Sequence, residues 1–209
     1  MFGGDFSVRV TDKPVPESIS PSIARTLQGK ATQLFRMGYD TPVIEIWPVK
    51  EVALKAKPAS PSQGLRMVPE TGLLGAVRIV GDRRDYRDDE MYGGTYTMRL
   101  GLQPQDGNHL GTSDFPYFGV LIPAKLDREL DGISTYKQLV KASSKETATD
   151  HPVLFSLRPV DAEGEELPTI TKPATDHRAI RIRIPGRAEG VTGQLSLVFD
   201  LVIEGVAQH

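Results

Sequence analysis

The sequence contains no cysteine and only four histidines among its 209 residues. Without cysteine the chain cannot form disulfides, thiolate nucleophiles, sulfur-ligated zinc sites or blue-copper centres. The redox state of the compartment stays open, because a chain without cysteine is compatible with both cytosol and periplasm. The absence therefore excludes several classes of redox and metal protein without fixing a location.

The sequence also lacks a strong charge of one sign and a long apolar run. Lys and Arg total 25, Asp and Glu total 27, and the formal net charge is -2. No global positive field is available to hold a polyanion, so we expect no nucleic-acid partner. Because no apolar stretch approaches the length needed to cross a bilayer, we also expect no membrane span.

Several sequence motifs of common enzymes are missing. There is no phosphate-binding G-x-x-x-x-G-K-[ST], no dinucleotide-binding G-x-G-x-x-G, no H-E-x-x-H and no G-x-S-x-G nucleophile elbow. These absences remove the motif basis for nucleotide binding, zinc proteolysis and α/β-type hydrolysis. We therefore expect a binding or structural protein rather than an enzyme.

What the sequence does contain is alternation of apolar and polar residues with a period of two. In the run TYTMRLGLQ, Tyr96, Met98 and Leu100 share one face of a strand, whereas Thr97 and Arg99 share the other. Similar patterns predict further strands. The predicted strands cover residues 31–37, 43–49, 73–80, 95–103, 118–124, 152–159, 179–185 and 194–205.

Helical signals are weak by comparison. DGISTYKQLVKA, residues 131–142, has apolar residues at helical spacing behind a cap at Asp131 or Ser134, and SIARTL allows one short turn. The sequence therefore predicts an all-β fold with one or two short helices. We expect an antiparallel β-sandwich, immunoglobulin-like or jelly-roll-like, that forms one domain over 1–209 with an extended N-terminal arm of about 30 residues.

The run QPQDGNHLGTSD is the main candidate site. It places Asp106, Asn108, His109 and Asp114 in one loop, with Tyr117 just after it. Oxygen ligands around a glycine suit a hard cation such as calcium, although the spacing does not follow an EF-hand. A β-turn alone would equally explain Gly107 and Asn108 but would not demand His109. We predict a ligand-binding surface at Asp106, Asn108, His109 and Tyr117.

Two other functions remain open. A metal-dependent hydrolase would bring Asp106, His109 and His151 to one cation, with Asp114 as a further ligand. A carbohydrate-binding module would use an exposed Trp47 or Tyr117 to stack on sugar rings. For Trp47 we favour the alternative, in which the only tryptophan fills the core. The partner would then be a small molecule, a glycan or a protein.

A dense run of opposite charges, DRRDYRDDE, occupies residues 82–90. Carboxylates in such a run would do acid and base chemistry only if they faced one another across a cleft. Alternating charges in a short run more often cancel one another on a solvated loop. We therefore interpret this segment as a charged surface connection between two strands.

Several motifs resemble a family of uncharacterised exported bacterial proteins. In that family a strand of the form G-x-Y-T-[LM]-R leads into Q-P-x-D-G-x-H-x-G, and an H-P precedes a later strand. The similarity covers roughly residues 42–160, with Gly93 standing where the family has a proline. The matching positions are Tyr96, Arg99, Gln103, Asp106, Gly107, His109, Gly111, His151 and Pro152.

The resemblance implies export and a β-rich fold but assigns no catalytic residue. The first residues, MFGGDFSVRV, have neither a basic segment nor an apolar core of the signal-peptide type. We therefore expect a periplasmic or secreted protein whose signal peptide has been removed. Together with the missing enzyme motifs, this predicts an exported, non-enzymatic binding or structural protein.

Overall fold

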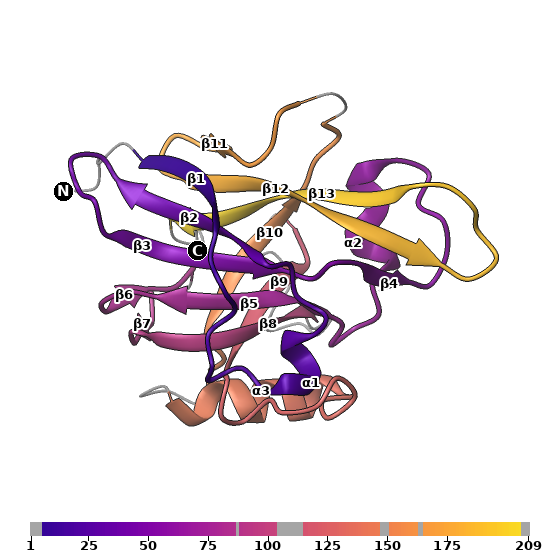
Figure 1. The fold of residues 1–209 in the computed structure, drawn as a ribbon, viewed down its shortest axis with the longest axis horizontal. Helices are drawn as coiled ribbons and strands as arrows, with labels where there is room; N and C mark the ends of the chain where they lie inside the picture. Colours follow the sequence, from indigo (N-terminus) through magenta and orange to yellow (C-terminus); the bar gives the residue numbers. More distant parts are fainter. Residues whose placement is uncertain (1–5, 87, 104–114, 147–150, 163–164, 206–209) are drawn as a thin grey trace.

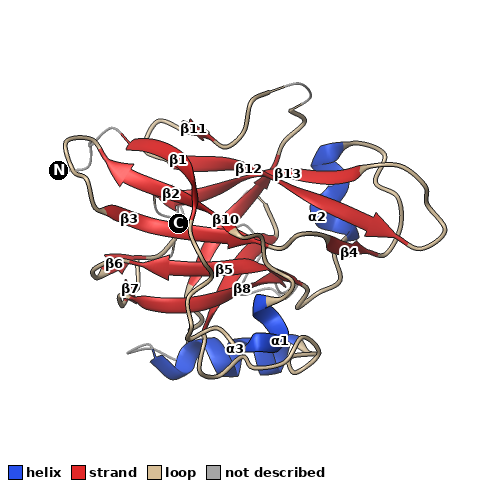
Figure 2. Cartoon of the chain, viewed as in Figure 1, coloured by secondary structure: helices blue, strands red, loops and turns tan. Residues whose placement is uncertain are grey.

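The computed structural model describes residues 6–86, 88–103, 115–146, 151–162 and 165–205. Strands dominate these residues, and the helices are short (Figures 1 and 2). The strands are β1 (Phe6–Asp12), β2 (Lys30–Arg36), β3 (Pro42–Pro48), β4 (Val52–Leu54), β5 (Leu73–Ile79), β6 (Arg83–Arg84), β7 (Glu90–Met91), β8 (Gly94–Leu102), β9 (Tyr117–Pro123), β10 (Leu154–Pro159), β11 (Thr169–Thr171), β12 (Arg178–Ala188) and β13 (Leu195–Glu204). The helices are α1 (Pro21–Ala24), α2 (Gly64–Met67) and α3 (Tyr136–Ser143), with 3₁₀ turns η1 (Pro61–Gln63) and η2 (Ser144–Glu146).

One curled sheet contains most of the strands, in the order β1-β2-β3-β5-β8-β9-β10-β13-β12-β11. All neighbours on this path are antiparallel, and the short β4 adds to β12 in parallel. Strand β10 is shared between the two halves of the sheet. Its first residues, Leu154–Ser156, pair with β9, and its last, Leu157–Pro159, pair with β13.

Because β10 pairs with both halves of the sheet, the observed fold agrees with the predicted one in class but not in architecture. The mostly-β class with short helices is confirmed. The two-sheet sandwich is not, because β10 joins what would be two sheets into a continuous half-barrel. The N-terminal arm begins with a paired strand, since Phe6–Asp12 pair with β2 along their whole length.

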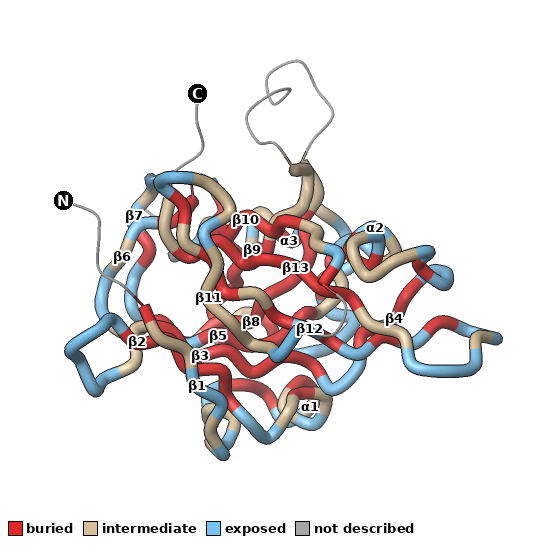
Figure 3. Tube along the Cα trace, turned by 90° about the horizontal axis from the view of Figure 1, so that it is seen from above, coloured by how far each residue is buried: buried red, intermediate tan, exposed pale blue. Residues whose placement is uncertain are grey.

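The concave side of the curl is filled by the inward residues of both halves. Ile44 and Met98 on the first half belong to the same apolar cluster as Ile182 and Phe199 on the second. Figure 3 shows these strands as largely buried and the surrounding turns as exposed. Among the described helices, none is long and apolar enough to cross a membrane.

The convex side of β8 and β9 is also covered. Helix α3 packs its Leu139 against Val120 and Ile122 of β9, and residues 13–29 continue from β1 past β3 to the same edge (Figure 2). Thr135 caps the N-terminus of the helix, and its side chain accepts a hydrogen bond from the backbone N–H of Gln138 in a capping box. As a result, both faces of β8 are buried.

Candidate functional site

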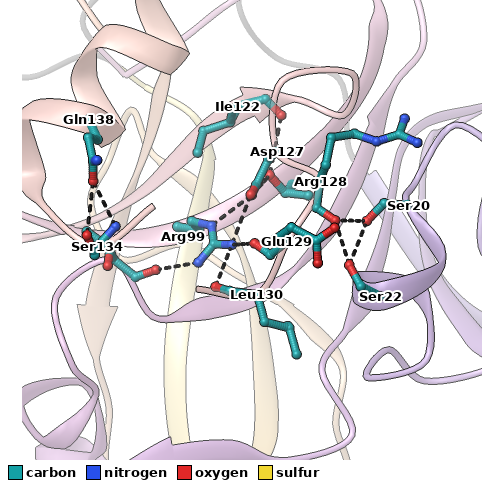
Figure 4. A network of polar contacts seen from close by, with 12 residues as sticks. Ser20, Ser22, Arg99, Ile122, Asp127, Arg128, Glu129, Leu130, Ser134 and Gln138 are labelled. Atoms are coloured by element: carbon teal, nitrogen blue, oxygen red, sulfur yellow. Dashed lines mark hydrogen bonds and ion pairs between the residues drawn. The ribbon is translucent and has the colours of Figure 1, made fainter. Parts of the chain in front are cut away.

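Arg99 on β8 lies at the centre of the covered face and is only 2 % exposed. Its guanidinium forms a bidentate pair with Asp127, with Nε 2.7 Å from Oδ2 and Nη2 2.9 Å from Oδ1. It also donates to the backbone carbonyls of Thr71, Glu129 and Leu130, each at 3.0 Å (Figure 4). One side chain therefore joins β8 to two loops that are distant in sequence.

Asp127 completes the neutralisation of this buried cation. It is 1 % exposed, and besides Arg99 it accepts from the hydroxyl of Thr97, which shares the covered face of β8. Isolated charges are costly to bury, so a pair survives in the interior only when its geometry and further hydrogen bonds offset the desolvation. Both members of this pair meet that condition.

Further hydrogen bonds hold each of the two loops that Arg99 joins. Thr71 adopts φ 66°, a left-handed conformation that a β-branched residue rarely takes. Its N–H donates to Leu100 and its carbonyl accepts from Arg99. On the other loop, the hydroxyls of Ser20 and Ser22 both donate to the carbonyl of Arg128 (Figure 4). The arm and the buried pair thus fix these loops together.

Between these loops the surface is hollowed by a cavity of about 500 Å³, which we call the Arg99 hollow. Its apolar lining comes from Val49, Val52, Leu73, Leu130 and Ile133. Leu130 is one of the few large apolar side chains that stay exposed, at 39 %. The hollow falls within the size range of small-molecule sites.

The charged lining of the Arg99 hollow is acidic. Glu51, Glu70 and Asp131 line it together with Arg99. Arg99 is matched by Asp127, and Glu51 forms an exposed pair with Arg187 at 3.5 Å. Glu70 and Asp131 form no ion pair within the part of the chain that the structure describes. The hollow therefore presents apolar walls beside two carboxylates without cationic partners among the described residues.

Most of the site predicted from sequence falls on residues that the structure does not describe. Asp106, Asn108, His109 and Asp114 are outside the described residues, so those predictions stay predictions. Tyr117 is half-buried, pairs with Leu102 at the base of the same hairpin and packs against the core. His151 is exposed and precedes β10. Among the described residues, no group of three or more acidic or histidine side chains could hold a metal ion.

Burial decides whether the aromatic residues Trp47 and Tyr86 could offer a surface for stacking on sugar rings. Trp47 is fully buried and its indole N–H donates to the carbonyl of Lys13 at 3.0 Å. The expectation that Trp47 fills the core is confirmed, and a stacking platform at Trp47 is wrong. Tyr86 is also buried, with its ring centroid 5.8 Å from that of His177. The charged run around Tyr86 is accordingly not a plain solvated loop, because Asp85 and Tyr86 are both buried.

His177 is a buried histidine whose ring lies beside both an arginine and an aspartate. It is 3 % exposed, and its Nδ1 atom is 3.3 Å from Nη2 of Arg158 and 3.7 Å from Oδ1 of Asp176. A guanidinium only donates, so this nitrogen of His177 acts as an acceptor. The contact with Arg158 therefore engages Nδ1 within the protein.

One residue of the buried pair could have been noticed in the sequence. Arg99 is an arginine inside an alternating strand and matches the motif of the resembling family. Asp127 carries no comparable signal, because nothing in the sequence shows which loop covers the Arg99 face of β8. The comparisons with known proteins add no assignment: no family model, no curated protein and no solved structure matches this chain.

Proposed function

We propose that the protein is a non-enzymatic binding protein whose ligand occupies the Arg99 hollow. The ligand class is a small molecule or side chain with an apolar body and a positively charged group. One observation carries the proposal: in a hollow of ligand size, apolar walls stand beside Glu70 and Asp131, which have no ion-pair partner among the described residues. Export from a bacterial cytoplasm, implied by the family resemblance, belongs to the same proposal.

The arrangement supports binding better than acid–base catalysis. A general acid or base needs a proton that it can release or take up near the reacting group. Arg99 donates to Asp127 and to fixed backbone carbonyls, and both oxygens of Asp127 accept, from Arg99 and from the hydroxyl of Thr97. Arg99 therefore lines the hollow as a fixed cation that Asp127 holds in place, and neither residue is placed to transfer a proton there.

Two probes with the same apolar body and opposite charge test the proposal. We expect phenethylamine to bind with a Kd of about 1 mM or tighter, and 3-phenylpropionate to bind at least about tenfold more weakly. The physical reason is attraction or repulsion by Glu70 and Asp131 at the hollow. Isothermal titration at low ionic strength measures both, because exposed charges are screened by salt.

Matched variants locate the binding. Ala53 is exposed and lines the hollow, so Ala53→Trp should fill the hollow and abolish amine binding without loss of folding. Ala59 is exposed and does not line it, so Ala59→Trp serves as the control. The double variant Glu70→Gln, Asp131→Asn should remove the preference for the amine. Equal binding of both probes to the wild type would contradict the proposal.

A further inference from the structure

A second hollow lies at one end of the curl, where strands from both halves of the sheet approach one another. It has a volume of about 220 Å³ and lies between the β6–β7 hairpin and the ends of β2 and β13. Arg36 on β2 reaches Glu204 on β13, with Nη2 3.3 Å from Oε1. Arg83 and Arg84 of β6 line the same space, which we call the Arg83 notch.

The carboxylates around the Arg83 notch are already engaged. Asp82 accepts from the backbone N–H of Gly93 at 3.0 Å. Asp85 accepts from the backbone N–H groups of Asp89 and Leu154, both at 3.1 Å. The remaining two are in ion pairs, Asp88 with Arg84 and Glu204 with Arg36.

Arg83 differs from its neighbours. It is half-buried, and its guanidinium forms no hydrogen bond or ion pair within the described part of the chain. Burial and the nearby charge of Arg36 lower the pKa of the Arg83 guanidinium, and Glu204 opposes that shift. Since arginine remains charged in proteins, Arg83 is a partly desolvated cation without a hydrogen-bonded or ion-paired partner among the described residues.

We propose that the Arg83 notch binds a small oxyanion, held by Arg83 with support from Arg36. A guanidinium presents paired N–H donors that match two oxygens of a carboxylate or phosphate group. The volume admits a group of that size and no large ligand. This site is separate from the Arg99 hollow, takes the opposite charge, and does not depend on the function proposed for the hollow.

Titrations with inorganic phosphate and with acetate test the proposal and distinguish tetrahedral from planar oxyanions. Each is compared with chloride at equal ionic strength, because general salt effects act on all exposed charges. We expect at least one of the two oxyanions to raise the melting temperature of the wild type above the chloride value. Arg83→Gln should weaken that binding at least about tenfold, as loss of a charge-assisted bidentate contact predicts.

Arg84→Gln is the matched control, because Arg84 is the next residue on the same strand and already donates to the carbonyl of Asp88. We expect Arg84→Gln to retain oxyanion binding within about threefold. In chloride, Arg83→Gln should melt no lower than the wild type, since it removes a cation that forms no hydrogen bond or ion pair with any described residue. Equal effects of phosphate and acetate on wild type and Arg83→Gln would overturn the proposal, as would a lower melting temperature of Arg83→Gln in chloride without any oxyanion dependence.

Discussion

Replacement of Asp127 by alanine is expected to lower the free energy of unfolding by about 3–5 kcal/mol. Asp127 is the only carboxylate that pairs with Arg99 in the described structure, and Arg99 is nearly inaccessible to solvent. Without Asp127 the guanidinium would stay buried with its charge uncompensated. Urea unfolding followed by circular dichroism measures the loss.

Two controls isolate the buried charge as the cause. Asp12 pairs with Lys30 at 3.5 Å on an exposed surface, so Asp12→Ala should cost less than about 1 kcal/mol. The double variant Arg99→Met, Asp127→Leu should lose less than the sum of the two single variants, because the charges are removed together. A cost of Asp127→Ala similar to that of Asp12→Ala would show that the pair does not hold the hollow together.

Replacement of Trp47 by alanine is expected to cost about 3–5 kcal/mol, as for other large buried aromatic side chains. Trp47 lies on β3 with no exposed surface, and its N–H fixes Lys13 at the start of the segment that crosses the sheet. Trp47→Phe retains most of the apolar volume and should cost about 1–2 kcal/mol, which includes the lost hydrogen bond. Circular dichroism is the appropriate readout because Trp47 is the only tryptophan.

The Trp47 variants also separate a core role from a sugar-binding role. A residue that stacked on sugar from the surface would lose glycan affinity when replaced, with little change in stability. We expect the reverse for Trp47. A Trp47→Ala protein as stable as the wild type would contradict the burial that excludes this residue as a platform.

The alternation in the sequence predicted the position of strand β8 and the burial of one of its two faces. Alternation placed Tyr96, Met98 and Leu100 together, and they do belong to the core. It also placed Thr97 and Arg99 together on the opposite face, and both of these polar residues are buried as well. That burial arises from α3, the loop before it and the N-terminal arm, which are far away in sequence. A local pattern contains no information about such a cover.

Other differences have similar physical causes. The helix predicted over 131–142 forms as Tyr136–Ser143, because Thr135 and Gln138 complete a capping box that Asp131 does not offer. The joining of the sheet at β10 depends on which partners each half of that strand finds. Period-two alternation is the same in a sandwich and in a curled sheet, so it cannot distinguish them.

The candidate site was harder to predict than the fold. The motif around His109 drew attention to one hairpin, while the described hollow lies at loops that carry little local signal. Glu70 and Asp131 belong to no motif in the sequence, and both are exposed in the structure. They become candidate ligand-binding residues only in the folded protein, because the Arg99–Asp127 pair brings their loops together around Leu73 and Ile133.

Amide chemical-shift mapping by NMR during a phenethylamine titration tests the central claim most directly. The account predicts saturable shifts at the loops of the Arg99 hollow, above all at Thr71, Gly72, Leu73 and Ile133. The same titration of Ala53→Trp should leave these amides unmoved. Shifts confined to the base of the β8–β9 hairpin, at Gln103 and Tyr117, or no saturable shift at all, would contradict it.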